Sequence, residues 1–240
     1  MATFVLCHGA HGGGWQWRVT ADLLRGQGHT VFTPTLTGLG ERVHLLQPDI
    51  SLETHITDIV NVFLYEQLDG VILVGHSYGG VVITGVANRI PERIAQLVYL
   101  DALVPHDGQS IATMLAPEVL AQLVAVVDQV GEGWKLPHIP EAGKPADARL
   151  GFHPLKTGMQ PVTLRNAAAL ALPRTFIYCT EDKELMVMGN LIIQAAEHAR
   201  RDPAWRYYEL PTDHLPMDNM PQVLAALFGE VADGRESVPR

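Results

Sequence analysis

The sequence of 240 residues is poor in cysteine and serine and contains no long hydrophobic segment. Its two cysteines, Cys7 and Cys179, are too few for a disulfide framework, so we expect two free, buried thiols. No stretch approaches the roughly 18 apolar residues of a membrane-spanning helix. The opening MATFVLCHG lacks a basic segment, and its apolar run is too short for a signal peptide. These absences predict a cytoplasmic protein without a membrane partner.

Clusters of positive charge are also missing. Lysine and arginine number 17 against 26 acidic residues, which gives a net charge of −9, and no block of basic residues occurs. Nucleic acids and anionic membranes are therefore poor partners for this chain. No group of histidines and carboxylates has the spacing and context of metal ligands, so we expect no metal.

The chain does contain short apolar runs that alternate with segments of helical periodicity. The runs typical of buried strands cover residues 3–7, 30–34, 70–75, the end of 94–103, 174–180 and 205–210. The segments typical of helices cover residues 17–28, 51–68, 79–90, 185–200 and 220–232. Strands that alternate with helices predict a mostly parallel sheet with helices on both faces.

Residues 104–172 have a different character. Prolines recur through this stretch, one clear helix is expected at 117–130, and no strand stands out. The stretch is too long for a tight connection between two strands. We therefore expect an α/β core formed by residues 1–103 and 173–240, with 104–172 inserted as a mainly helical cap.

The stretch GHSYG at residues 75–79 matches G-x-S-x-G and lies between an expected strand and an expected helix. The turn in this motif is so sharp that side chains at its flanking positions would collide with neighbouring backbone. It forces Ser77 into a strained conformation with its hydroxyl exposed. Because the chain has only four serines, a chance match is improbable, and we predict that Ser77 is a nucleophile. His76 points elsewhere at such a turn and is expected to be structural.

A serine hydroxyl needs a general base, and the base needs a carboxylate to orient it. In enzymes with this motif, the order along the chain is serine, acid, histidine. Of eleven histidines, His214 alone follows the last expected strand, so we predict that it is the base. Its neighbour Asp213 is expected to point away. Three carboxylates remain as candidates for the acid: Glu181 and Asp182 follow one late strand, and Asp101 ends the strand before it.

Negative charge that develops on an attacked carbonyl oxygen needs preorganised N–H donors. One donor is expected to be the backbone N–H of Tyr78, directly after the nucleophile, and the other that of Ala10, in the loop after the first core strand. A second His-Gly dipeptide begins the run HGGG at His11, three residues too late for this role. We expect its glycines to allow close packing between loop and helix.

With these residues identified, the chain resembles the methylesterase and hydroxynitrile lyase branch of the α/β-hydrolases, which includes a plant salicylic-acid-binding esterase. The resemblance lies in FVLCHGAHGGGWQW, GHTVFTPTLTGLG, VGHSYGG, IYCTEDK and DHLPM, in this order along nearly the whole chain. It implies an α/β-hydrolase fold and no cofactor, and it suggests a homodimer. It places the catalytic triad on Ser77, Asp182 and His214 and the oxyanion hole on Ala10 and Tyr78.

Two departures separate this chain from the lyases of that branch. Gly9 stands where the lyases have a threonine, and Leu215 stands where they have a lysine. Neither residue can stabilise a leaving cyanide. We therefore expect a serine carboxylesterase that hydrolyses small, hydrophobic or aromatic carboxylic esters through an acyl-enzyme. The alternatives are hydroxynitrile lyase or other C–C bond cleavage by the same triad, and a non-catalytic receptor for a small molecule.

Overall fold

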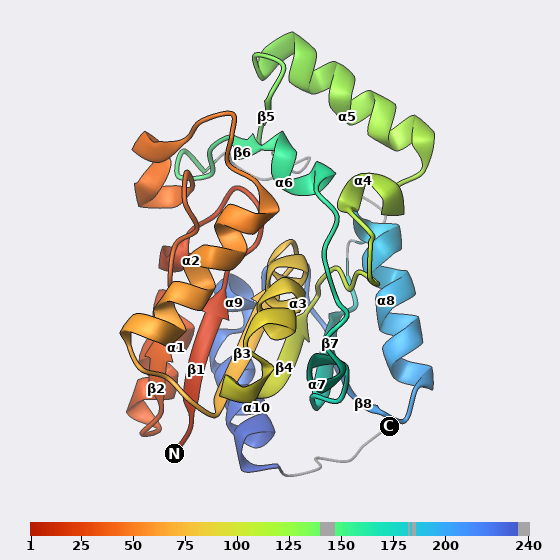
Figure 1. Ribbon diagram of the computed structural model, residues 1–240. Coiled ribbons are helices and arrows are strands. Elements are labelled where there is room, and N and C mark those ends of the chain that lie inside the picture. Colours follow the sequence, from red (N-terminus) through yellow and green to blue (C-terminus); the bar gives the residue numbers. More distant parts are fainter. Residues whose placement is uncertain (140–146, 182, 184–185, 235–240) are drawn as a thin grey trace.

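The computed structural model contains a central sheet of six parallel strands in the order β2-β1-β3-β4-β7-β8 (Figure 1). It describes residues 1–139, 147–181, 183 and 186–234. The strands are β1 (Thr3–Cys7), β2 (Thr30–Phe32), β3 (Val71–His76), β4 (Ile94–Leu100), β7 (Arg174–Cys179) and β8 (Trp205–Leu210). The parallel sheet expected from the alternating pattern is confirmed.

Helices cover both faces of this sheet because successive residues of each strand point to opposite sides. In β1, Phe4 and Leu6 pack into the core on one side, and Val5 and Cys7 pack into the core on the other. The first core is closed by α1 (Arg18–Gly26) and α10 (Pro221–Asp233). The second is closed by α2 (Leu52–Tyr65), α3 (Gly79–Arg89) and α8 (Gly189–Arg201).

The segment between β4 and β7 lies largely above the carboxyl ends of the strands (Figure 1). Its elements are α4 (Ile111–Met114), α5 (Pro117–Val130), β5 (Lys135–Leu136), β6 (His153–Pro154), α6 (Leu155–Met159) and α7 (Ala167–Leu170). No strand stands out here in the sequence, but β5 and β6 form a short antiparallel pair. Two residues per strand leave no periodic signal in a sequence. The division into core and cap at 104 and 172 stays a prediction.

The remaining short elements are 3-10 helices at Gly14–Trp17, Gly40–Leu45 and Pro91–Arg93, and the single helical turn α9 (Pro216–Asn219). Among the residues described above, no helix is both long enough and apolar enough to cross a membrane.

The carboxyl ends of parallel strands meet at one edge of a sheet, which is where α/β proteins bind ligands. The loop after β1 begins at His8, Ser77 follows β3, Asp101 follows β4, and the loop after β8 carries His214. Since β1, β3 and β4 are neighbours, the first three of these positions lie side by side in the sheet.

Candidate active site

Ser77 occupies the tight turn between β3 and α3. Its φ angle is 54°, in the left-handed region that residues other than glycine rarely adopt. The turn is held by the backbone, since the N–H of Ser77 donates to the carbonyl of Leu100 at 3.2 Å. The Ser77 carbonyl accepts from the N–H groups of Gly80 and Leu103, each at 3.1 Å. The strained backbone expected from G-x-S-x-G is therefore present, and Ser77 stays partly exposed.

The glycines around Ser77 are required by close backbone approach. A Cβ atom on Gly75 would lie 2.6 Å from the carbonyl oxygen of Gly79. A Cβ atom on Gly79 would lie 2.8 Å from the carbonyl oxygen of Cys7, at the end of β1. Both separations are shorter than real Cβ contacts, so only glycine fits and the turn packs directly on the neighbouring strand.

His214 is held at its side chain and at its backbone. Its Nδ1 donates to Oδ2 of Asp101 at 2.6 Å, because an ionised carboxylate can only accept. Nε2 of the neutral ring is then unprotonated, as a general base requires. On the other side, Nε2 of His76 donates to the backbone carbonyl of His214 at 2.8 Å. His76 therefore positions the loop that carries the base, in agreement with the structural role expected for it.

Asp101 is completely buried, and its backbone adopts a φ angle of 45°. Oδ1 accepts the N–H of Cys179 at 3.0 Å, and Oδ2 contacts both His214 and the ammonium group of Lys183, the latter at 2.7 Å. Burial by itself would raise the pKa of Asp101, but the hydrogen bond and charge of His214, together with the charge of Lys183, hold the pKa below its ordinary value. Asp101 is therefore an ionised carboxylate inside the protein.

The carboxylate beside His214 thus differs from the one that the resemblance implies. Asp182 lies outside the described residues, so its role stays a prediction. Glu181, the other candidate after β7, is exposed. Asp213 accepts the N–H of Leu215 at 2.9 Å and so caps the turn that follows it. The ends of β4 and β7 reach the same edge of the sheet, and the spacing of residues along the chain does not distinguish them.

The loop after β1 passes directly beside the nucleophile. A Cβ atom on Gly9 would lie 3.0 Å from Cβ of Ser77 and 3.0 Å from Nδ1 of His76. Within the described parts of the chain, the backbone N–H groups of Ala10 and Tyr78 donate to no protein acceptor. An oxyanion hole needs N–H groups without an internal acceptor, so these two stay the candidates for that role.

The side chain of Tyr78 is fixed by two histidines. Nε2 of His55 donates to the carbonyl of Thr37 at 3.0 Å, which leaves Nδ1 to accept the Tyr78 hydroxyl at 2.8 Å. Burial lowers the pKa of His55 to about 4, so this tautomer is neutral. The ring of His153, from β6, packs edge-on against the Tyr78 ring at a centroid distance of 4.8 Å. The residue after the nucleophile is therefore anchored by both α2 and the segment above the sheet.

The second His-Gly dipeptide connects this segment to the core. Nδ1 of His11 donates to the carbonyl of Gly151 at 2.9 Å, and the His11 N–H donates to Nδ1 of His153 at 3.4 Å. A side chain on Gly14 would collide with the carbonyl of Thr33. The glycines of this run thus allow close packing, as expected.

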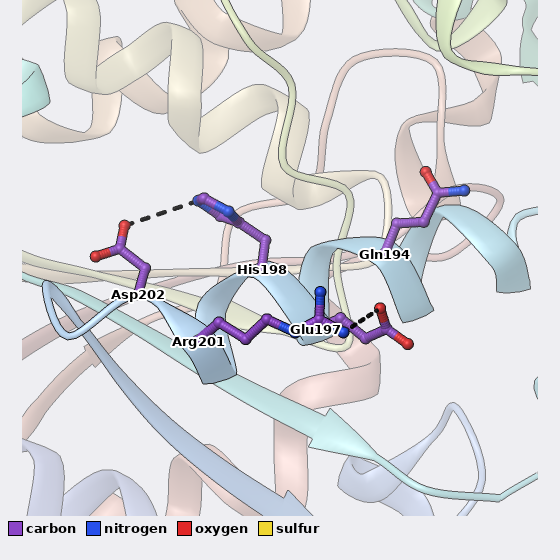
Figure 2. A pocket seen from close by; sticks show the side chains of 5 residues that line it. All are labelled: Gln194, Glu197, His198, Arg201 and Asp202. Carbon is purple, nitrogen blue, oxygen red and sulfur yellow. Dashed lines mark hydrogen bonds and ion pairs between the residues drawn. The ribbon is translucent and has the colours of Figure 1, made fainter.

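A hollow of about 330 Å³ on α8 is separate from these residues (Figure 2). It is lined by Gln194, Glu197, His198, Arg201 and Asp202. Four of them lie in the middle and at the end of α8, and Asp202 follows its last residue; α8 returns from the carboxyl end of β7 to the start of β8. The hollow therefore lies toward the opposite edge of the sheet from Ser77, and it contains no nucleophile.

Lys183 and the contacts of His76 and His55 were not anticipated from the sequence. Lys183 follows β7 by four positions, inside the acidic run TEDKE, where a lysine is typical of an exposed turn. Only the folded chain brings it to Asp101.

The chain is similar both to a protein family as a whole and to individual known proteins. The model of the alpha/beta hydrolase family matches residues 4–227. A carbendazim hydrolyzing esterase of Nocardioides sp. (strain SG-4G) is 56% identical over 128 residues, which are 52% of this chain and 53% of that protein. The aligned stretch thus spans about half of that relative. Methylesterase 1 of Arabidopsis thaliana is 26% identical over 281 residues, covering 96% of this chain and 95% of that protein.

Among solved structures, an extracellular α/β-hydrolase of a Paenibacillus species has a TM-score of 0.79 and 25% identity. The match covers 96% of this chain and 98% of the other, which is described as sharing structural and functional homology with tobacco salicylic acid binding protein 2. The resemblance to the methylesterase branch is confirmed by these relatives. Sequence, sheet topology and comparison agree that this chain belongs to the alpha/beta hydrolase family.

Proposed function

We propose that this protein is a serine carboxylesterase that hydrolyses small, hydrophobic or aromatic carboxylic esters through an acyl-enzyme intermediate. The observation that carries the proposal is the 2.6 Å contact between His214 and the buried Asp101, at the sheet edge where Ser77 occupies a strained turn. The names of the two relatives, an esterase and a methylesterase, support the same reaction class.

In this mechanism, the hydroxyl of Ser77 attacks the ester carbonyl while Nε2 of His214 accepts its proton. Asp101 keeps the proton of the imidazole on Nδ1 and stabilises the imidazolium that forms. The N–H groups of Ala10 and Tyr78 donate to the oxyanion of the tetrahedral intermediate. As the intermediate collapses, His214 returns the proton to the leaving alcohol. Water then attacks the acyl-enzyme by the same route and releases the acid.

We assign the orienting role to Asp101 in place of Asp182, which the resemblance implies. The contacts of Asp101 support this assignment, since its two oxygens receive hydrogen bonds from the backbone and from the base. The chemistry needs no cofactor. The expected homodimer and cytoplasmic location stay predictions.

The alternative of cyanohydrin cleavage is not favoured. The lyases of this branch carry a threonine at the position of Gly9, where a Cβ atom would lie within 3.0 Å of both Ser77 and His76. Leu215 provides no cation after the catalytic histidine. A non-catalytic receptor that retains the triad stays the other alternative, and a burst of product distinguishes an esterase from it.

The test is the pre-steady-state hydrolysis of p-nitrophenyl acetate. We expect a burst of p-nitrophenol stoichiometric with enzyme, followed by slower turnover. Ser77→Ala should remove the burst and nearly all turnover, whereas Ser51→Ala, which changes a serine at the start of α2, should keep both. Retention of more than about 5% of kcat in the Ser77 variant would contradict the mechanism. A panel of p-nitrophenyl and methyl esters with acyl and alcohol groups of increasing size then identifies the preferred substrate.

A further inference from the structure

Lys183 is a buried cation in direct contact with the carboxylate that orients the base. Its Nζ lies 2.7 Å from Oδ2 of Asp101, and the two side chains are 4% and 0% exposed. The same Oδ2 accepts the proton on Nδ1 of His214 at 2.6 Å. One carboxylate oxygen therefore accepts a hydrogen bond from the imidazole and at the same time forms an ion pair with the ammonium group.

The negative charge of Asp101 therefore interacts with two partners, Lys183 and His214. A buried ionised carboxylate is stable only when its charge is compensated. While His214 is neutral, Lys183 supplies that compensation, so the group of three carries no net charge. When His214 takes a proton, the group carries one net positive charge, and the ammonium of Lys183 opposes the change.

Among the residues that the structure describes, the other groups that pack against His214 and Lys183 do not change their charge near neutral pH. From β3, the ring of His76 packs 4.5 Å from the His214 ring, and burial lowers the pKa of His76 to about 3, so it stays neutral. From the loop after β8, Asp213 is engaged at its own turn by the N–H of Leu215.

The groups on β7 are equally inert near neutral pH. The ring of Tyr178 lies 5.5 Å from Nζ of Lys183, and burial raises the pKa of its phenol. Burial also raises the pKa of the Cys179 thiol, whose backbone N–H donates to Asp101. Between pH 5 and 8, His76, Tyr178 and Cys179 therefore keep a constant charge.

The backbone of Lys183 also packs closely against the start of α8. A Cβ atom on Gly189, at the start of α8, would collide with the carbonyl of Lys183. The close approach fixes the position from which the lysine side chain reaches Asp101 across the end of β7.

We propose that Lys183 is a positioning residue for the esterase reaction: its ammonium group holds the Asp101 carboxylate ionised and aimed at His214, and it extends the activity of the base to lower pH. The inference rests on the proposed function, since it presupposes that His214 is the base for Ser77. Lys183 acts through Asp101 and has no assigned contact with substrate.

The test compares pH profiles of kcat/KM for a soluble p-nitrophenyl ester. In Lys183→Met, loss of the positive charge makes protonation of His214 easier, so we expect the acidic midpoint of kcat/KM to rise by about one pH unit. We expect kcat at pH 8 to fall while KM changes little. Lys183→Arg keeps the charge and should retain the wild-type midpoint. Because acid also destabilises the fold, the folded fraction of each variant is measured at every pH and kcat/KM is normalised to it.

The matched control is Lys156→Met, which removes the same charge from an exposed lysine of α6 and should leave the profile unchanged. An unchanged midpoint in Lys183→Met would overturn the proposal and leave Lys183 as a structural ion pair. Activity that survives in Ser77→Ala would instead overturn the proposed function, so the two failures are distinguishable.

If Lys183→Met does not accumulate as folded protein, the double variant with Asp101→Asn provides the test. The double variant buries no unpaired charge, so it should accumulate as folded protein where Lys183→Met alone does not. Absence of this rescue would show that the lysine does not act through Asp101 and would overturn the proposal.

Discussion

His76 and His214, which are 138 positions apart, are joined by a hydrogen bond of 2.8 Å from the His76 ring to the His214 backbone carbonyl. His76, the residue before Ser77, thereby holds the loop that carries His214. Ser77 and His214 are consequently not positioned independently, since a shift of the turn at Ser77 is transmitted to the loop after β8.

His76→Phe keeps an aromatic ring in this position and removes the donor to the His214 carbonyl. We expect kcat to fall roughly 10- to 100-fold, because small displacements of a catalytic group are costly, with a smaller effect on KM. Steady-state kinetics on a p-nitrophenyl ester measure both constants. His29→Phe is the control, because His29 packs edge-on against Phe4, away from the triad. Equal losses in the two variants would show that the His76 bond has no special role.

Two isosteric variants distinguish the two candidates for the carboxylate that orients His214, Asp101 and Asp182. Asp101→Asn should keep the local shape but favour the wrong imidazole tautomer, with a loss of up to roughly 10⁴ in kcat. Asp182→Asn should remain near wild type. Both are measured at pH 8, and thermal unfolding confirms that each variant is folded.

The reverse outcome has an equally clear meaning. If the Asp182 variant is inactive and the Asp101 variant retains activity, the acid is the one implied by the family resemblance. The contact of Asp101 with His214 would then not be the one that orients the imidazole during catalysis.

Acid should destabilise this protein steeply, because several buried histidines are neutral in the fold. Burial lowers the pKa of His8 and His55 to about 4 and that of His76 to about 3. Their pKa values in the unfolded chain lie near 6.5, so the unfolded state binds more protons at pH values between about 4 and 6.5. The associated stability is fully present above pH 6.5 and is lost as the pH falls. Each group contributes about 2 kcal/mol of this loss at pH 5.

The measurement is the free energy of unfolding in urea between pH 7.5 and 5. We expect it to decrease with falling pH, with a slope that reflects uptake of several protons on unfolding. His55→Gln should flatten that slope, whereas His44→Gln, at an exposed position, should leave it unchanged. A free energy that stays constant across this range would contradict the assignment of neutral histidines.

Local signals in the sequence were sufficient for the strands of the central sheet, the longer helices and the turn at Ser77. Alternating apolar runs predict strands because burial on both faces of a sheet requires them. The turn at Ser77 was predictable because its glycines are required by backbone contacts within a few residues. For example, a Cβ atom on Gly75 would lie 2.6 Å from the carbonyl oxygen of Gly79. His214 was identifiable as the base candidate because it follows the last strand.

Tertiary structure decided which groups surround that base. Asp101 and the residues after β7 all follow strands that end at the same edge, so order along the chain leaves them equivalent. The placement of Lys183 depends on the close packing of its backbone against Gly189 at the start of α8. The sequence by itself determined the strands of the central sheet, the longer helices and the turn at Ser77, because these follow from local sterics and burial. Only the folded chain determined the partners of His214, because contacts between distant segments depend on sheet order and on how each loop crosses its edge.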